Sequence, residues 1–455
     1  MKFLSINPTT NQLLKRFNTL SNSQLTDVLK KAEFGFAINR TSSLKTRSKR
    51  MNTLAGLLME NQIPLAKLIT MEMGKPIEEA KAEIKKCAWV CEYYANNAKH
   101  FLKDEIINTE NSASVITHAP LGVLLAIMPW NFPFWQVFRF AAPALMAGNS
   151  VILKHAANVP QCAIAIEQLF RTAQFSEGLF QSIFVDHGMV KRIIEDPMVR
   201  GISLTGSNLA GSTVAELAGK NIKKTVLELG GSDPFIVLDD ANLKLAAEAA
   251  IQSRMSNAGQ SCIAAKRLIV VEPVLNSFVE LLTEHIRQLK VGDPMNEDTD
   301  VGPLAREDLA ETVAKQVKES MRLGAEAVIG GNRPADKKGA FFNPTLLVNV
   351  KEGMPVFEEE IFGPVAAVIA ARDVQHAISL ANKTKYGLGS SIWTLDRDKA
   401  TRLARQIQAG GVFINTIVHS DPRLPFGGIK QSGYGRELSS YGIREFVNTK
   451  TIVVN

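Results

Sequence analysis

Cysteine is scarce in this sequence. Four residues in 455, Cys87, Cys91, Cys162 and Cys262, are too few to form a disulfide framework for so long a chain, and this usage is typical of a reducing compartment. Cys87 and Cys91 lie one helical turn apart, but no histidine or second cysteine pair follows at the spacing of zinc ligands. We therefore expect no metal site.

Long apolar runs are also missing. The N-terminal residues 1–12 lack the apolar core of a secretory signal, and no run approaches the roughly 20 apolar residues that cross a bilayer. We expect a cytoplasmic protein that does not contact membranes.

Strong charge of one sign is absent as well. The net charge of +7 is small for this length, and no lysine and arginine block with interleaved aromatics accompanies it. This argues against a nucleic-acid partner and favours small anionic ligands such as phosphates and carboxylates.

The hydrophobic pattern indicates the fold. The length predicts two or three domains. Apolar spacing of three and four predicts helices over 23–37, 43–60 and 78–100. After residue 121, predicted strands at 123–128, 151–153, 182–185, 202–204 and 225–229 alternate with predicted helices at 136–148, 160–174 and 208–219. A second series is predicted near 235 and at 267–271, 365–370, 389–394 and 411–415. This alternation predicts an α/β fold with two doubly wound domains and a site at the strand carboxyl ends.

A nucleotide signal is present only in part. The dinucleotide fingerprint GxGxxG is absent, but Gly206 and Ser207 close a predicted strand, and Gly211 follows in the next helix. Glycines at such a turn let backbone N–H groups approach a phosphate at the positive end of the helix, although a plain turn would look the same. Lys154, at the end of another strand, could bind a ribose or a phosphate, or extend to solvent.

Three residues suggest acyl chemistry. Cys262 follows a small polar segment, so its thiolate could meet a substrate carbonyl, although most lone cysteines are inert core residues. Glu228 ends an apolar strand, where partial desolvation would raise its pKa toward that of a general base; it could instead cap the next turn. Asn131 lies between two prolines that could hold its amide as an oxyanion donor, or it could be a turn residue.

Six motifs carry a family resemblance. They are MPWNFP at 128–133, LTGS at 204–207, LELGG at 227–231, GQSC at 259–262, EEIFGPV at 359–365 and PFGGIKQSGYGRE at 425–437. In this order, over essentially the whole chain, they resemble the aldehyde dehydrogenase superfamily, and most of all its bacterial succinate-semialdehyde dehydrogenases. The resemblance implies NAD(P)-dependent oxidation of an aldehyde to a carboxylic acid through a thioester on the enzyme. It also implies a Rossmann-like cofactor domain at 1–108 and 121–231, a catalytic domain at 232–436, and an arm at 109–120 and 437–455 that builds a homodimer or homotetramer.

The resemblance also assigns roles. Cys262 is implied as the nucleophile, with a low-pKa thiolate, Glu228 as the general base and Asn131 as the oxyanion donor. Implied cofactor contacts are Trp130, Lys154, Ala157, Gly206, Ser207, Gly211, Leu229, Glu360 and Phe362. Ala157 replaces a glutamate of NAD-preferring members, so nothing there repels a 2′-phosphate, and we expect NADP or NAD as cofactor. A protonated His155 could assist.

Substrate identity depends on few residues. Arg139 lies eight residues, about two helical turns, after Asn131, and matches an arginine that binds the substrate carboxylate in similar enzymes. Ser420, Arg423 and Phe426 are the other implied substrate contacts. A further arginine common in those enzymes is replaced here by Ser256. Despite this departure, the resemblance and Arg139 lead us to expect succinate semialdehyde as the substrate.

Alternatives remain at this stage. Glutarate semialdehyde and uncharged aliphatic aldehydes are possible substrates. Transfer of the acyl group to coenzyme A is disfavoured by Glu228, and a non-catalytic binding protein on the same fold is disfavoured by the intact catalytic set.

Overall fold

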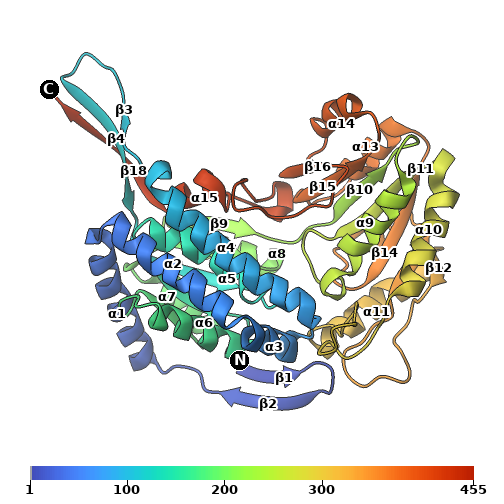
Figure 1. The fold of residues 1–455 in the computed structure, drawn as a ribbon, viewed down its shortest axis with the longest axis horizontal. Helices are drawn as coiled ribbons and strands as arrows, with labels where there is room; N and C mark the ends of the chain where they lie inside the picture. The colour runs from blue at the N-terminus through green and yellow to red at the C-terminus, as the bar shows by residue number, and fades with distance from the viewer. Residues whose placement is uncertain (1–2) are drawn as a thin grey trace.

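The structure, a computed structural model, describes residues 3–455 as two α/β lobes and a thin sheet that projects from one of them (Figure 1). This arrangement confirms the predicted fold class. An N-terminal hairpin of β1 (Phe3–Asn7) and β2 (Gln12–Phe17) lies at the base of the first lobe.

The first lobe is built on a six-stranded sheet. In spatial order its strands are β17 (Gly433–Tyr434), β9 (Lys224–Glu228), β8 (Val199–Thr205), β5 (Val123–Met128), β6 (Ser150–His155) and β7 (Phe180–Ile183). One face packs on α1 (Asn22–Thr41), α7 (His187–Glu195) and α8 (Asn208–Lys220). The other packs on α2 (Leu44–Glu60), α3 (Gln62–Met73), α4 (Ile77–Phe101), α5 (Trp135–Met146) and α6 (Pro160–Thr172). Side chains alternate along each strand: on β5, Val123 and Leu125 enter the first of these cores, and Leu124 and Ala126 enter the second.

The second lobe holds a seven-stranded sheet. Its order is β12 (Glu326–Ile329), β13 (Thr345–Val348), β14 (Val365–Ala371), β11 (Ala265–Val271), β10 (Asp233–Val237), β15 (Gly389–Trp393) and β16 (Gly411–Ile414). The helices of this lobe are α9 (Leu243–Met255), α10 (Leu275–Gln288), α11 (Glu307–Arg322), α12 (Pro355–Glu358), α13 (Val374–Asn382) and α14 (Arg397–Ala404). A separate apolar core fills it, so each lobe has its own core, as the sequence predicts.

The projecting sheet joins β3 (Glu105–Ile106), β4 (Ala113–Pro120) and β18 (Val447–Val454). Residues 437–446, which the sequence predicts as part of the arm, lie instead against the first lobe. There Glu437 pairs with Arg139, and the Tyr94 hydroxyl donates to the backbone oxygen of Ser439, at the start of α15 (Ser439–Glu445).

The connectivity of the first sheet creates a crevice. From β5 the chain proceeds to β6 and β7 on one side, and then returns to β8 and β9 on the other. Helices on either side of such a reversal diverge at the strand carboxyl ends, where α/β proteins bind ligands. The segments 129–131 and 205–207 leave the sheet at this point.

Among the helices of residues 3–455, none has a stretch long and apolar enough for a membrane crossing.

Candidate active site

Cys262 lies in a tightly held loop between α9 and β11. Asn257, Ala258 and Gly259 have φ values of 53°, 52° and 75°, a left-handed conformation that is costly for residues with a side chain. Buried Arg254 holds the loop by donating to the Gly259 backbone oxygen at 3.2 Å and to the Val365 backbone oxygen at 2.6 Å. The loop geometry is therefore fixed before any ligand arrives.

Asn131 faces this loop. Its Nδ2 donates to the Gln260 backbone oxygen at 3.0 Å, and the Asn257 side chain donates to the Asn131 backbone oxygen at 2.8 Å. An amide NH₂ has two N–H donors, so one remains available beyond the bond to Gln260. The residue is 4% exposed, which makes a fixed donor of this kind effective on a developing oxyanion.

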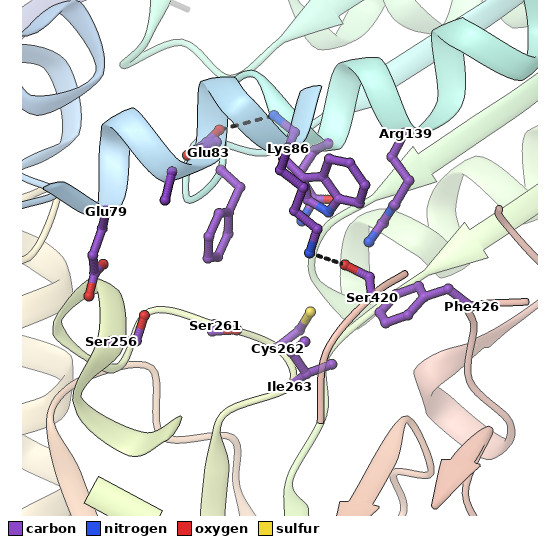
Figure 2. A pocket seen from close by; sticks show the side chains of 14 residues that line it. Glu79, Glu83, Lys86, Arg139, Ser256, Ser261, Cys262, Ile263, Ser420 and Phe426 are labelled. Atoms are coloured by element: carbon purple, nitrogen blue, oxygen red, sulfur yellow. Dashed lines mark hydrogen bonds between the residues drawn. The ribbon is translucent and has the colours of Figure 1, made fainter. Parts of the chain in front are cut away.

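Cys262 borders two cavities. A cavity of about 230 Å³ lies on one side, under α4 and α5, and its labelled residues surround the Cys262 sulfur in Figure 2. A cavity of about 390 Å³ lies on the other side, at the crevice of the first sheet, and Asn131 lines it together with Cys262. We call these the inner cavity and the crevice. The structure thus brings the predicted nucleophile and oxyanion donor together.

The Cys262 thiol is protonated at rest. Burial raises the pKa of the Cys262 thiol to about 12, and the positive charges of Lys266 and Arg139 oppose that rise only in part. The low-pKa thiolate expected from the sequence is therefore wrong for the ligand-free site. Lys266 Nζ donates to the backbone oxygens of Ser261 and Cys262, at 2.7 Å each, and lies 3.4 Å from a carboxylate oxygen of Glu360.

Glu228 is buried close to Glu437 and Arg139. It is the last residue of β9 and is 2% exposed, and neither of its carboxylate oxygens has a hydrogen-bond partner among the described residues. Burial and the neighbouring Glu437 carboxylate raise the pKa of Glu228 well above its usual range, against the lowering effect of Arg139. Its raised pKa agrees with the expectation of a tuned base. Its side chain, however, is not among the groups that line either cavity beside Cys262.

The crevice carries most of the predicted cofactor residues. Those lining it are Trp130, Gly206, Ser207, Leu229, Glu360 and Phe362. Ser207 caps α8, because its side chain accepts the Ala210 N–H, so the positive end of α8 opens at the crevice. Trp130 and Phe362 pack edge to face, with their ring centroids 5.7 Å apart, and form an aromatic wall of the crevice.

These groups fit a nicotinamide dinucleotide. The α8 N-terminus suits a pyrophosphate, the aromatic wall suits a flat ring, and the Glu360 carboxylate can accept from ribose hydroxyls. Glu360 is held in place by the Gly231 N–H at 3.1 Å. Gly230 lies against the same carboxylate, where a Cβ would collide with it.

The three remaining predicted cofactor residues lie on α8 and at or just after the end of β6. Gly211 is buried in α8 one turn after Ser207, packed against Leu229. Lys154 is the penultimate residue of β6 and is 9% exposed. Ala157 follows β6, and its backbone oxygen accepts the Leu4 N–H at 3.2 Å. None of the three is among the described residues that line the crevice.

His155 does not supply a positive charge, which corrects the sequence expectation. It is fully buried, its Nε2 lies 2.8 Å from the Pro133 backbone oxygen, and its Nδ1 accepts the Ala156 N–H at 2.8 Å. Burial lowers the pKa of His155 to about 4, so the ring is neutral near pH 7.

Three of the four predicted substrate residues line the inner cavity. They are Arg139, Ser420 and Phe426, and the Arg139 guanidinium lies 4.6 Å from the Phe426 ring centroid. Arg139 also forms a buried ion pair with Glu437. The structure does not place Arg423 in this cavity: its side chain is 67% exposed and forms a two-pronged ion pair with Asp421.

Sequence reasoning missed several site residues. Lys86 lines the inner cavity, and Arg306 lines the crevice. Glu79, Glu83 and Lys86 follow one another at intervals of four and three in a predicted helix, which places them on one face. That charged stripe was the signal that could have identified Lys86.

Comparisons with known proteins agree with this geometry. The model of the aldehyde dehydrogenase family matches residues 1–452. A relative from Synechocystis sp., named as a probable succinate-semialdehyde dehydrogenase for NADP(+), is 48% identical over 452 residues, which cover 99% of each chain. The succinate-semialdehyde dehydrogenase 1 for NADP(+) of Mycobacterium tuberculosis is 46% identical over 455 residues, again 99% of each chain. A crystal structure of succinic semialdehyde dehydrogenase from Streptococcus pyogenes, in complex with NADP+, superposes with a TM-score of 0.97 at 38% identity and covers 99% of both chains.

Proposed function

The chain belongs to the aldehyde dehydrogenase family, and on that premise we propose that it oxidises succinate semialdehyde to succinate with NADP(+) or NAD(+). The observation that carries the choice of substrate is the presence of two cationic side chains in the lining of the inner cavity, where Glu83 is already paired with Lys75. Lys86 and Arg139 both line this cavity, which lies on the opposite side of Cys262 from the crevice. The second functional group of a short aldehyde would lie there. The names of the relatives at 46–48% identity support the same substrate and cofactor.

The residues of the chain divide the reaction between them. Cys262 adds through its sulfur to the aldehyde carbon, the C=O π bond opens to place the negative charge on oxygen, and the thiol proton passes to solvent water as the C–S bond forms. The free N–H of the Asn131 amide then stabilises the negative oxygen of the adduct, a contribution of roughly 3–4 kcal/mol where such donors have been removed. A nicotinamide dinucleotide bound in the crevice would accept the hydride that this adduct releases.

The second half releases the acid. Loss of the hydride leaves a thioester on Cys262, and Glu228 removes a proton from the water that attacks the thioester carbon. The C–S bond then breaks, the sulfur takes up a proton to regenerate the thiol, the acid leaves as its carboxylate, and the net proton passes to solvent. Glu228 must turn toward the crevice for this step, and its two unpartnered oxygens leave it free of hydrogen bonds that would oppose the rotation.

We base the proposed choice of cofactor on the residues at and just after the end of β6. Ala157 carries no carboxylate that would repel a 2′-phosphate, and Lys154 offers a cation. His155 is neutral and contributes no charge. We therefore expect NADP(+) to be used at least as well as NAD(+), and rejection of NADP(+) by a hundredfold would contradict this.

The test is a panel of aldehydes assayed with each cofactor. Succinate semialdehyde, glutarate semialdehyde and butanal separate chain length from charge. A kcat/KM for succinate semialdehyde at least tenfold above that of the other two supports the proposal. Equal values for succinate semialdehyde and butanal would refute it.

Assembly and location complete the proposal. The arm leaves apolar side chains exposed, among them Ile106 at 80% and Val454 at 53%, which supports burial in a homodimer or homotetramer. We also expect a cytoplasmic enzyme, in keeping with four unpaired cysteines.

A further inference from the structure

We propose that Glu79 is a positioning residue of the active site. From the first lobe, its carboxylate holds the left-handed backbone of the loop that carries Cys262, and through Asn257 it holds the oxyanion donor Asn131. The inference rests on the roles proposed above for Cys262 and Asn131 in aldehyde oxidation. It gives Glu79 no contact with the aldehyde or with the cofactor.

The Cys262 loop, residues 256–264, is held at two places. Within its own lobe, Arg254 donates to the Gly259 backbone oxygen at 3.2 Å, which fixes the backbone after the left-handed turn. Asn257, the first left-handed residue, has a φ of 53°, and such a conformation persists only where the surroundings impose it. The start of the loop therefore needs a support of its own, and it lies against α4 of the first lobe.

Glu79 provides that support. Its Oε2 accepts the Asn257 backbone N–H at 2.7 Å, although 178 positions separate the two residues in the chain. Asn257 is fully buried, so its N–H depends on a protein acceptor. Figure 2 shows the Glu79 side chain leaving its helix toward Ser256, the residue before Asn257. One hydrogen bond from the first lobe thus fixes the backbone where the left-handed turn begins.

The Asn257 side chain extends this support to the oxyanion donor. Its Nδ2 donates to the Asn131 backbone oxygen at 2.8 Å and to the Gln260 backbone oxygen at 3.1 Å. The Asn131 side chain donates to the same Gln260 oxygen at 3.0 Å. A shift of Asn257 would therefore move the oxyanion donor and the segment that leads to Cys262. Because a misplacement of about 1 Å can lower a rate about 10²-fold, the contact made by Glu79 matters for catalysis.

A direct effect on the substrate is the alternative role for Glu79, because its side chain also lines the inner cavity. A carboxylate that acts on the substrate would change the reaction of a charged aldehyde and leave that of an uncharged one unaffected. A positioning residue would lower kcat for both, since both aldehydes use the same nucleophile and the same oxyanion donor. The hydrogen bond to Asn257 favours the positioning role.

The protonation state of Glu79 determines how firmly it holds the loop. Burial raises the pKa of Glu79 to about 7. The charge of Lys75 and the hydrogen bonds from Asn257 and Ser256 oppose this rise in pKa, and the Glu83 carboxylate adds to it. An ionised carboxylate accepts a stronger hydrogen bond than a neutral carboxyl group. The loop should therefore be held more firmly above pH 7 than below it.

The experiment compares Glu79→Leu and Glu79→Gln with Glu92→Leu, a change at an exposed glutamate of the same helix. Each protein is assayed with succinate semialdehyde and with butanal. Leucine accepts no hydrogen bond, so Glu79→Leu should lower kcat about 10- to 100-fold with both aldehydes and change each KM less than about threefold. Glutamine keeps a neutral acceptor, so Glu79→Gln should retain most of the activity. Glu92→Leu should behave as the unaltered enzyme.

Glu79→Gln also gives a pH readout. Glutamine does not ionise, so the kcat of the unaltered enzyme divided by that of Glu79→Gln should rise from about one near pH 6 to roughly three- to tenfold near pH 8. The ratio cancels the titration of groups that both proteins share, Glu228 included. A ratio that stays constant over this range would refute the role of Glu79. If Glu79→Leu does not fold, this ratio decides the matter.

The failure of each proposal has its own signature. If the unaltered enzyme does not prefer succinate semialdehyde to butanal, the proposed function fails. The role of Glu79 is then decided by alkylation of Cys262, which Glu79→Leu should accelerate because the loop is less firmly held; an unchanged rate would refute that role. If the unaltered enzyme shows the preference, the role of Glu79 is refuted when Glu79→Leu keeps its kcat or loses activity with succinate semialdehyde alone.

Discussion

At the scale of single residues, burial disfavours the ionised forms of both Cys262 and Glu228. Burial raises the pKa of the Cys262 thiol to about 12, so the thiol keeps its proton near pH 7, and it also raises the pKa of the Glu228 carboxyl well above its usual range. A thiol rather than a thiolate protects the nucleophile from oxidation while no substrate is present. Binding must therefore supply the stabilisation that removes the thiol proton, and turnover should rise as the pH increases above 7.

The role of Glu228 can be isolated by Glu228→Gln. The amide keeps the shape of the side chain but cannot accept a proton, so steady-state turnover should fall about 10²- to 10⁴-fold. A single-turnover burst of reduced cofactor should remain, because addition by Cys262 does not need this base. The burst is followed by cofactor absorbance in rapid mixing, with the exposed Glu216→Gln as control. Loss of the burst as well would contradict the assignment to the second half.

At the scale of elements, the Cys262 loop depends on backbone contacts that cross the second lobe. Arg254, at the end of α9, connects three segments by donating to the backbone oxygens of Gly259, Ile361 and Val365. Left-handed Asn257 and Ala258 persist because these contacts fix the backbone around them. The nucleophile is thus positioned by an element that never touches substrate.

Replacing Arg254 by Met tests this support. Several buried carbonyl groups would lose their donor, so the free energy of unfolding should fall by about 3 kcal/mol or more. Thermal unfolding should show the loss, and the rate of Cys262 alkylation should change because the loop relaxes. Arg287→Met, at an exposed position on α10, is the matched control. Unchanged unfolding in Arg254→Met would contradict the proposed bracing.

The elements differ in how far sequence predicts them. Strand β5 is predicted over its full span, because a continuous apolar run has one solution in a parallel sheet. The strand expected at 182–185 is observed as β7 at Phe180–Ile183, since neighbouring strands set its register. Helix α3 and the β1–β2 hairpin were not predicted, because tertiary packing rather than local pattern stabilises them.

The site was predictable where its motifs are local. Cys262, Asn131 and Ser207 each lie in a distinctive short segment, and the structure brings them to adjoining cavities. The pairing of Arg139 with Glu437 was not predictable, because 298 positions separate them (437 minus 139) and only the fold brings them together. The exposure of Arg423 has a local cause, because its guanidinium forms an ion pair with Asp421, two residues away.

At the scale of the whole molecule, the arm is an incomplete structure. One of its three strands, β3, has only two residues, and β18 at the edge of the sheet carries the exposed Ile452, Val453 and Val454. Such an edge invites pairing with a second copy of the chain.

The arm is tested by the paired change Ile452→Lys and Val454→Lys. Two charges on the apolar strand should prevent association, so the mass measured by light scattering should fall from that of a dimer or tetramer to that of one chain. Leu395→Lys, at a position 70% exposed on the second lobe, should leave the mass unchanged. A monomeric unaltered protein, or an oligomeric double variant, would each contradict this assembly.

The pair between Arg139 and Glu437 has a wider consequence, because Glu437 stands just before α15 and β18. The C-terminal segment that we propose for assembly therefore also begins with the carboxylate that pairs with Arg139 at the inner cavity. A chain cut before residue 437 would lose more than its contacts with other copies. It would also remove Leu438, Ile443 and Phe446 from the core of the first lobe. It would leave the Arg139 guanidinium without its carboxylate, and the pKa of Glu228, which Glu437 raises and Arg139 lowers, would fall.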